Sequence, residues 1–421
     1  VTKTTDPDWE PVMKIASAIV TETGGRTSHA AIVARELGIP AIVGAEHAMR
    51  NIPAGQMITV DTTGNEGVVL EGALRYEVRE HDMKTLPKTR TKIMMNIATP
   101  DTAFAKSFLP HRGVGLARLE FIIASSIGAH PLALGAYPRL PPALKSAIDV
   151  RTAGWQDKKE FYIAALASGM AKIGLAFHPY PVIVRFSDFK SNEYRLLLGG
   201  ERYEPEEENP MIGWRGASRY YDPRFKEAFA WECEAIARAR DRMYLKNIIP
   251  MVPFCRTPEE GGKTLALMAD AGLMTRYERK RRRLPAKTPV VPVYVMCEIP
   301  SNVLLADQFL EIFDGMSIGS NDLTQLTLGL DRDSGALGHV GNEENPAVRE
   351  MVAAAIRACA KKKKYVGICG QAPSDHPAFT RFLVEEGIES ISLNPDAVVK
   401  TTIAVAGIEK KLRHQKSRRA A

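Results

Sequence analysis

Most of the chain, from about residue 91 to residue 412, alternates between short apolar runs and longer stretches with helical periodicity. Short apolar runs bounded by polar residues predict buried strands, and the stretches between them, such as 225–244 and 347–360, predict helices. The predicted strands are 93–98, 113–116, 182–186, 248–252, 293–297, 316–318, 366–368 and 390–393. Eight strands that alternate with helices predict a (β/α)8 barrel of the TIM type over residues 92–412.

Residues 1–80 show a shorter and more mixed pattern. Short apolar runs predict strands at 13–20, 39–43, 57–60 and 67–70. The last two flank the turn sequence Asp-Thr-Thr-Gly-Asn and predict a hairpin. Between the first two, apolar residues at 30, 33, 34 and 37 repeat at helical spacing and predict a helix with one apolar face. The chain is therefore predicted to be an α/β protein with a small α/β domain before the barrel.

The remaining segments complete the predicted organisation. Residues 81–91 are polar and predict a linker, and residues 413–421 predict a disordered basic tail. The chain opens with Val1 and not with Met, so we expect a fragment or processed piece whose first domain is truncated. A targeting signal at the true N-terminus would then lie outside this sequence.

Composition narrows the class of protein only moderately. The chain has 421 residues, of which 45% are hydrophobic, enough for one small and one large globular domain. Lys and Arg number 56 against 49 Asp and Glu, and this mild excess suits anionic substrates as well as nucleic acid. The five cysteines form no Cys-x-x-Cys pair, which favours a reducing, cytoplasmic location over a disulfide framework or zinc site. No apolar run approaches the roughly 18 residues of a membrane helix.

A tight turn precedes the first long helix. Gly24 and Gly25 free the backbone for the turn, and Thr27 and Ser28 can cap the helix. His29 then falls in the first turn, where unpaired N–H groups and the helix dipole favour an anion. An imidazole there can accept a phosphoryl group and hold it against those N–H donors. A surface histidine beside a cap gives the same pattern, and the spacing alone leaves both interpretations open.

Polar residues follow several of the predicted barrel strands. Barrel enzymes carry their chemistry at the C-terminal ends of the strands, so these side chains are expected to share one face. They are Arg118, Arg185, Glu298, Asn321, Asp322 and Cys369. Each alone would be an ordinary loop residue, but six chemically compatible residues at one predicted face favour a site.

The stretch 23–41, which contains Gly-Gly-Arg-Thr-Ser-His, resembles the phosphohistidine domain of the phosphoenolpyruvate-utilising family. The family's phosphorylated histidine falls on His29. The predicted barrel resembles the substrate-binding barrel of the same family in the stretches 113–121, 184–194, 209–216, 296–302, 317–325 and 367–375. The strings Ser-Asp-Phe-Lys-Ser-Asn-Glu-Tyr and Gly-Gly-Glu-Arg-Tyr-Glu-Pro favour the C-terminal two domains of the phosphoenolpyruvate synthase branch over the pyruvate phosphate dikinase branch and the sugar-transport Enzyme I branch.

The resemblance implies a reaction in which ATP, pyruvate and water give phosphoenolpyruvate, AMP and phosphate. The histidine would carry the phosphoryl group to the barrel, and the linker would let its domain swing between two sites. The resemblance also implies an upstream ATP-grasp domain and a homodimer formed through the barrel. Because no glycine-rich nucleotide-binding segment is recognisable here, we expect this chain alone to lack the ATP half-reaction.

The implied reaction assigns roles to the barrel residues. A pyruvate enolate beside a phosphoryl group needs a divalent cation and guanidinium groups to stabilise its charge. Glu298 and Asp322 offer hard oxygen ligands for Mg²⁺. Arg118 and Arg185 would clamp the phosphoryl group and the enolate oxygen, because a planar guanidinium matches such oxyanions.

Further residues would complete the substrate site. Asn321, with backbone N–H groups near Gly319 and Ser320, would hold the substrate carboxylate. Arg215 fits a phosphate contact and a structural salt bridge equally well. Cys369 is the predicted proton shuttle at the pyruvate methyl carbon, because it lies between glycines and near cationic groups. A packing role is the alternative for Cys369 and the expected role of the other four cysteines.

Some features leave other functions open. The basic run 279–283 fits a solvated insertion loop better than a nucleic-acid patch, because no aromatic platform accompanies it. Lys361 to Lys364 fit the C-terminal dipole of a helix. A non-catalytic phosphocarrier or regulatory half-protein would display His29 alone, and the intact Glu298, Asp322 and Cys369 argue against it. A barrel that binds RNA has only the basic run in its favour.

Overall fold

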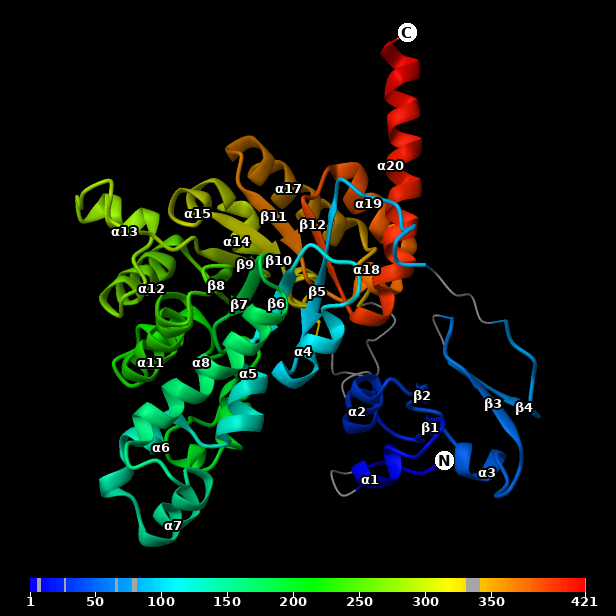
Figure 1. Cartoon of the computed structure of the whole chain (residues 1–421), viewed down its shortest axis with the longest axis horizontal. Helices are drawn as coiled ribbons and strands as arrows, with labels where there is room; N and C mark the ends of the chain where they lie inside the picture. Colours follow the sequence, from blue (N-terminus) through cyan, green and yellow to red (C-terminus); the bar gives the residue numbers. More distant parts are fainter. Residues whose placement is uncertain (6–8, 26–27, 65–66, 78–81, 331–340, 421) are drawn as a thin grey trace. The chain divides into compact units, whose positions relative to one another are not determined.

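The computed structural model describes residues 1–5, 9–25, 28–64, 67–77, 82–330 and 341–420 (Figure 1). Within these ranges, only the backbone is described for residues 10, 29, 32, 35, 36 and 416–420. The chain divides into two compact units, Val1–Glu80 and His81–Ala421. Among the described residues, none of the helices combines the length and the apolar character that crossing a membrane requires.

The first unit is a small α/β module. Its elements in chain order are α1 (Glu10–Met13), β1 (Ile19–Val20), α2 (His29–Leu37), β2 (Ala41–Ile42), α3 (Ala48–Asn51), β3 (Ile58–Asp61) and β4 (Val68–Glu71). β1 and β2 pair in parallel, and β3 and β4 form the predicted antiparallel hairpin. Met13, Ile19 and Ala34 form the buried centre of this unit.

The predicted strand at 13–20 is wrong over most of its length. Met13 ends α1, and only Ile19 and Val20 form a strand. Ile15 is 85% exposed, so the apolar run does not line one buried face. The strand is confined to the two positions that pair with Ala41 and Ile42 of β2.

The second unit is built on a closed barrel of parallel strands. These are β5 (Lys92–Ile97), β6 (Val114–Arg118), β7 (Val182–Arg185), β8 (Ile248–Val252), β9 (Tyr294–Cys297), β10 (Gly315–Ile318), β11 (Tyr365–Ile368) and β12 (Ser390–Leu393). Each strand pairs with the next along the chain, and β12 pairs with β5 to close the barrel. The predicted (β/α)8 architecture is confirmed, because every predicted apolar run falls on a strand of the barrel.

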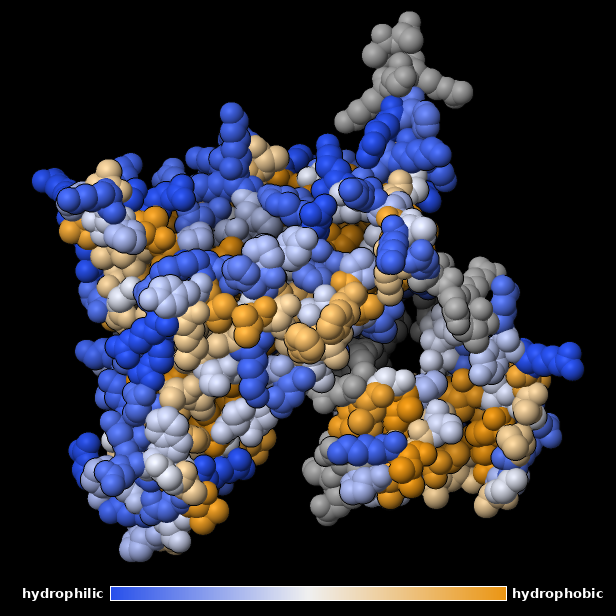
Figure 2. Space-filling model, in the orientation of Figure 1, coloured by the Kyte–Doolittle hydropathy of each residue, from blue (hydrophilic) through white to orange (hydrophobic). Residues whose placement is uncertain are grey.

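Helices surround this barrel and connect its strands. The longer ones are α4 (Pro100–Lys106), α7 (Pro142–Arg151), α8 (Lys158–Ala176), α11 (Lys226–Ala237), α12 (Pro258–Asp270), α15 (Ala306–Ile312), α16 (Ser320–Leu328), α17 (Pro346–Lys362), α19 (Pro377–Glu386) and α20 (Val398–Ala420). The short ones are α5 (Leu119–Ile122), α6 (Pro131–Gly135), α9 (Ser191–Arg195), α10 (Ala217–Tyr220), α13 (Arg276–Arg281), α14 (Pro300–Leu304) and α18 (Ala372–Asp375). Hydrophilic residues predominate over the outer helices of this unit on the face drawn in Figure 2.

Apolar side chains fill the inside of the barrel. The interior cluster consists of Met94, Leu116, Ile183, Met251, Met296 and Cys369. Near the N-terminal ends of the strands, the rings of Tyr294 and Tyr365 stack with their centroids 4.5 Å apart. Cys369 follows β11, so it belongs to the cluster at the opposite, C-terminal end. The barrel is therefore a packed core whose C-terminal mouth carries the predicted site residues.

Two basic segments differ from their predictions. The basic run 279–283 was expected as an insertion loop, but most of it lies in or next to the short helix α13, which Thr275 caps. Arg281 and Arg282 both bind the buried carboxylate of Glu278, at 2.6 and 2.8 Å. The predicted disordered tail from residue 413 is also wrong, because α20 continues to Ala420. Helical backbone hydrogen bonds extend past the point where polar composition suggested disorder.

The last helix holds the entry to the first barrel strand. Glu409 of α20 is buried, and its carboxylate accepts the backbone N–H groups of Arg90 and Thr91, at 2.8 Å each. Glu409→Ala should lower the free energy of unfolding by about 2–3 kcal/mol, because one buried and one partly buried N–H donor lose their acceptor. Urea unfolding followed by circular dichroism measures the change. The exposed Glu385→Ala serves as the control and should stay within about 0.5 kcal/mol of the parent; equal effects of the two substitutions would contradict the role of Glu409.

Candidate active site

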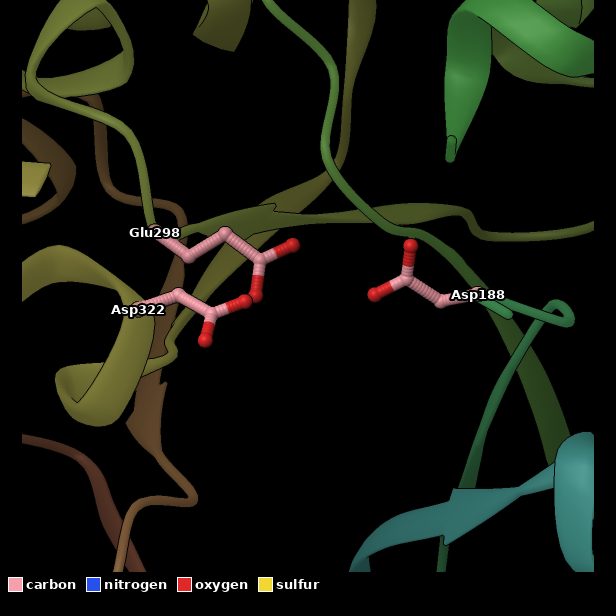
Figure 3. A group of neighbouring side chains, drawn as sticks. All are labelled: Asp188, Glu298 and Asp322. Carbon is pink, nitrogen blue, oxygen red and sulfur yellow. The ribbon is translucent and has the colours of Figure 1, made fainter. Parts of the chain in front are cut away.

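Three carboxylates meet at the C-terminal mouth of the barrel. Asp188 follows β7, Glu298 follows β9, and Asp322 lies in the first turn of α16 after β10. One carboxylate oxygen from each lies within 4.8 Å of the others. Figure 3 shows Glu298 and Asp322 side by side, with Asp188 facing them from the other side. The closed barrel therefore gathers acidic side chains that are far apart in the sequence.

Arg215 lies among these carboxylates. Its Nε and Nη2 donate to the two oxygens of Asp188, at 3.0 and 2.5 Å, and Nη2 also donates to Asp322 at 3.0 Å. The guanidinium carbon lies 4.0 Å from the centre of the Phe254 ring. The side chain is almost fully buried. The structure shows the salt bridge that the sequence left open, and the phosphate contact stays a prediction.

Arg185 forms a second charged bridge at the end of β7. Its Nη2 donates to Glu120 at 2.5 Å, and its Nη1 lies 3.3 Å from Asp188. Glu120 also accepts the backbone N–H of Asp188 at 2.9 Å. Sequence reasoning did not assign Glu120 or Asp188 to the site. The available signal was their place three residues or fewer from Arg118 and Arg185, in stretches that carried the resemblance.

The pKa values of Glu298 and Asp188 are shifted in opposite directions. Glu298 is 1% exposed, and burial, together with the charges of Asp322 and Asp188, raises its pKa to about 8. Its Oε1 accepts the backbone N–H of Phe254 at 2.7 Å. Burial also acts to raise the pKa of Asp188, but the guanidiniums of Arg215 and Arg185 outweigh it and the pKa is lowered. Glu298 is thus the carboxylate whose charge the arginines compensate least.

Cys369 lies at the same mouth. It is 6% exposed, and burial raises the pKa of its thiol to about 11. Its Sγ lies 3.6 Å from the carbonyl oxygen of Ile318. Arg118 is among the cations that act on this thiol, and its register on β6 places it beside Arg185 of β7. The thiol is therefore protonated at neutral pH and lies near the arginines.

The loop after β10 packs tightly against the loop after β11. A Cβ on Gly370 would lie 1.7 Å from Ser320 Oγ, and a Cβ on Gly319 would lie 2.9 Å from a carboxylate oxygen of Glu298. Ser320 Oγ donates to Glu343 at 3.3 Å. The side chain of Asn321 accepts the backbone N–H of Gln371 at 3.5 Å. These residues border the acidic cluster, and their binding of a substrate carboxylate stays a prediction.

His29 belongs to the other unit. It is the first residue of α2, and its side chain lies outside the described part of the structure. Ser28 Oγ is buried and has no hydrogen-bond partner among the described residues, so the expected side-chain cap is not seen there. Thr27, the other expected cap, also lies outside the described residues. The helix start is as predicted, and the phosphoryl-accepting role of His29 stays a prediction.

Two family profiles cover nearly the whole chain. The profile described as "PEP-utilising enzyme, mobile domain" matches residues 1–65, and the one described as "PEP-utilising enzyme, PEP-binding domain" matches residues 73–410. The chain belongs to the family of phosphoenolpyruvate (PEP)-utilising enzymes. The mobile-domain match contains α2 and His29, and the PEP-binding match contains the whole acidic cluster.

Curated relatives support the same placement. Phosphoenolpyruvate synthase of Synechocystis is 56% identical over 98% of this chain and 49% of its own length. The corresponding Aquifex aeolicus protein is 53% identical over 98% of this chain and 52% of its own length. The chain thus spans about half the length of these relatives. A solved structure of an HpcH/HpaI aldolase/citrate lyase family protein from Burkholderia cenocepacia is 15% identical to this chain, with a TM-score of 0.39. The match covers 79% of this chain and 95% of the other.

The raised pKa of Glu298 predicts how stability depends on pH. Its pKa is 4.5 when unperturbed and about 8 in the folded chain, so the folded state binds this proton more tightly. The resulting stabilisation is full below about pH 4.5 and is lost as pH rises through about 8. Glu298→Gln cannot titrate, so its free energy of unfolding should fall less than that of the parent between pH 6 and pH 9. Urea unfolding without divalent cations measures both slopes.

The control for this prediction is Glu385→Gln, which changes an exposed carboxylate on α19. It should keep the pH slope of the parent chain. If Glu298→Gln also kept the parent slope, the carboxyl of Glu298 would titrate near its ordinary pKa and the assigned burial effect would be wrong.

Proposed function

We propose that the chain transfers a phosphoryl group between a phosphohistidine at His29 and pyruvate, giving phosphoenolpyruvate. It would do so as the C-terminal part of a phosphoenolpyruvate synthase, whose full reaction converts ATP, pyruvate and water to phosphoenolpyruvate, AMP and phosphate. The observation that carries the proposal is the gathering of three carboxylates, two guanidiniums and a thiol at one barrel mouth. The family membership and the relatives' name support the same reaction.

The proposed reaction joins a proton transfer at carbon to a phosphoryl transfer at oxygen. The thiolate form of Cys369 takes a proton from the methyl carbon of pyruvate, and the enolate oxygen attacks phosphorus as the P–N bond to His29 breaks. In the reverse direction the enolate carbon regains a proton, and the protonated thiol of Cys369 supplies it. Arg118 and Arg185 stabilise the oxyanions, and Asn321 with the backbone near Gly319 and Ser320 holds the carboxylate.

The acidic cluster suits a divalent cation. Glu298 and Asp322 are the proposed Mg²⁺ ligands, and Asp188 adds a third carboxylate within reach. Among the described residues, Glu298 takes part in no ion pair with a basic side chain, so a cation bound there would replace the proton that its raised pKa retains. When bound, Mg²⁺ would supply positive charge to the enolate oxygen and the phosphoryl group. Arg215 shares Asp188 and Asp322 with this proposed site.

The rest of the enzyme completes the proposal. The ATP half-reaction would belong to an ATP-grasp domain upstream of this chain, and two barrels would pair in a homodimer. Both rest on the resemblance to the family. A cytoplasmic location agrees with five free, buried cysteines.

Phosphoryl transfer to His29 is open to direct measurement. With Mg²⁺ and ³²P-labelled phosphoenolpyruvate, without ATP, the chain should gain a label that is labile in acid and stable in base. His29→Ala should remove the label because the accepting nitrogen is gone. His47→Asn is the control in the same unit, since asparagine tolerates the positive φ of 63° at that position. Label that persists in His29→Ala would overturn the assignment.

Cys369 and the cation ligands should separate in two assays. Cys369→Ser replaces the thiol with a far weaker acid, so exchange of pyruvate methyl protons with deuterated water should fall to the solvent background. Labelling of His29 from phosphoenolpyruvate should survive, because that step needs no proton at the methyl carbon. Asp322→Ala should lose both activities, because a cation held there would stabilise the enolate in either direction. NMR measures the exchange of the pyruvate methyl protons for deuterium.

The control for the thiol is Cys255→Ser, because Cys255 is also buried and its Sγ lies 3.4 Å from a carbonyl oxygen, that of Thr257. It should retain both activities. Full methyl exchange in Cys369→Ser would mean that another group carries the proton, and Cys369 would then be a packing residue.

A further inference from the structure

A second acidic group lies buried behind the site and takes no part in the proposed chemistry. Glu232 of α11 is fully buried, and none of the ion pairs found among the described residues includes it. Burial raises the pKa of this carboxyl to about 7. Burying an acid without a cationic partner lowers the free energy of unfolding, and an apolar side chain in the same space would avoid this desolvation cost. Packing alone therefore does not explain a carboxyl group at this position.

The polar groups around Glu232 converge on a single residue, Ser187. Its backbone N–H donates to Glu232 Oε2 at 3.0 Å, and its Oγ donates to Glu232 Oε1 at 2.5 Å. The same Oγ lies 2.8 Å from the hydroxyl of Tyr194. The carbonyl oxygen of Ser187 accepts from the hydroxyl of Tyr220 at 2.7 Å. Every polar group of Ser187 is thus held, and Glu232 holds two of them.

Ser187 is the residue before Asp188. The backbone N–H of Asp188 is held in turn by Glu120, at 2.9 Å. With both residues fixed through their backbones, the Asp188 carboxylate is directed toward Arg215, Glu298 and Asp322 (Figure 3). Asp188 lies beyond the last residue of β7, so the strand's own ladder does not fix it.

We infer that Glu232 is a positioning residue for the candidate cation site: its contacts with Ser187 hold Asp188 in place beside Glu298 and Asp322. This inference rests on the proposed function, because it takes the acidic cluster to be the cation site. Glu232 itself touches neither the cation nor the substrate. Its effect is carried through the backbone of residues 187 and 188.

A double-mutant cycle with Mn²⁺ as the probe tests the inference. Glu232→Gln keeps the size of the side chain but replaces one acceptor oxygen with a donor, so Ser187 loses one of its two contacts. The expected result is about tenfold weaker Mn²⁺ binding, measured by electron paramagnetic resonance on the folded chain. In an Asp188→Asn background the same substitution should change affinity less than twofold, because the residue it acts through is already altered. Glu234→Gln is the matched control, on the same helix but partly exposed, and should bind Mn²⁺ like the parent.

Hydrogen–deuterium exchange gives a readout that does not depend on the cation. The amides of residues 186–190 should exchange faster in Glu232→Gln than in the parent or in Glu234→Gln, while β8 and β9 stay protected. Parent-like Mn²⁺ affinity in Glu232→Gln, or an equal loss in the Asp188→Asn background, would overturn the inference. If the parent chain bound no Mn²⁺, the proposed cation site would fail, and unchanged exchange at 186–190 would separately overturn the role of Glu232.

Discussion

The buried contact between Asp188 and Arg215 is the interaction on which the barrel mouth depends. Three carboxylates within 4.8 Å of one another repel strongly in a buried site. Arg215 binds two of them, and Arg185 also lies beside Asp188, at 3.3 Å. The two arginines compensate burial and carboxylate repulsion least at Glu298, so the pKa of Glu298 is raised. Near neutral pH the carboxyl of Glu298 therefore largely keeps its proton, and a bound cation would take the place of that proton.

A set of residues behind the site maintains this geometry. Glu120 binds both Arg185 and the backbone of Asp188, and Glu232 holds the neighbouring Ser187. Each of these carboxylates accepts hydrogen bonds from residues at or just beyond the end of β7, where the strand ladder stops. The closed barrel brings the strands together, and these carboxylates set the direction of the side chains that follow them. A displacement of about 1 Å at such a site is enough to impair catalysis, which gives the supporting contacts their weight.

The local sequence pattern predicted the wrong secondary structure in two segments, 13–20 and 279–283. The apolar run at 13–20 suggested a strand, but Ile15 faces solvent and only two residues find a parallel partner. The basic run 279–283 suggested a loop, but the buried Glu278 draws Arg281 and Arg282 back onto α13. In the first segment the two-residue extent of the parallel partner limited the strand, and in the second a carboxylate three and four residues earlier on the same helix bound the arginines. These arginines are committed to an internal carboxylate, which weakens the case for a nucleic-acid patch.

The sequence by itself determined the (β/α)8 architecture, because each strand is a short apolar run and each connection is long enough for a helix. It also located Glu298, Asp322 and Cys369 at strand ends, where barrel geometry makes neighbours of them. Only the tertiary structure decided that Arg215 forms a salt bridge, that Asp188 joins the acidic cluster, and that Glu120 and Glu232 support it. The physical reason is that strand position follows from a local pattern. A hydrogen bond between side chains 27 to 107 residues apart depends on barrel closure and register, which no local pattern encodes.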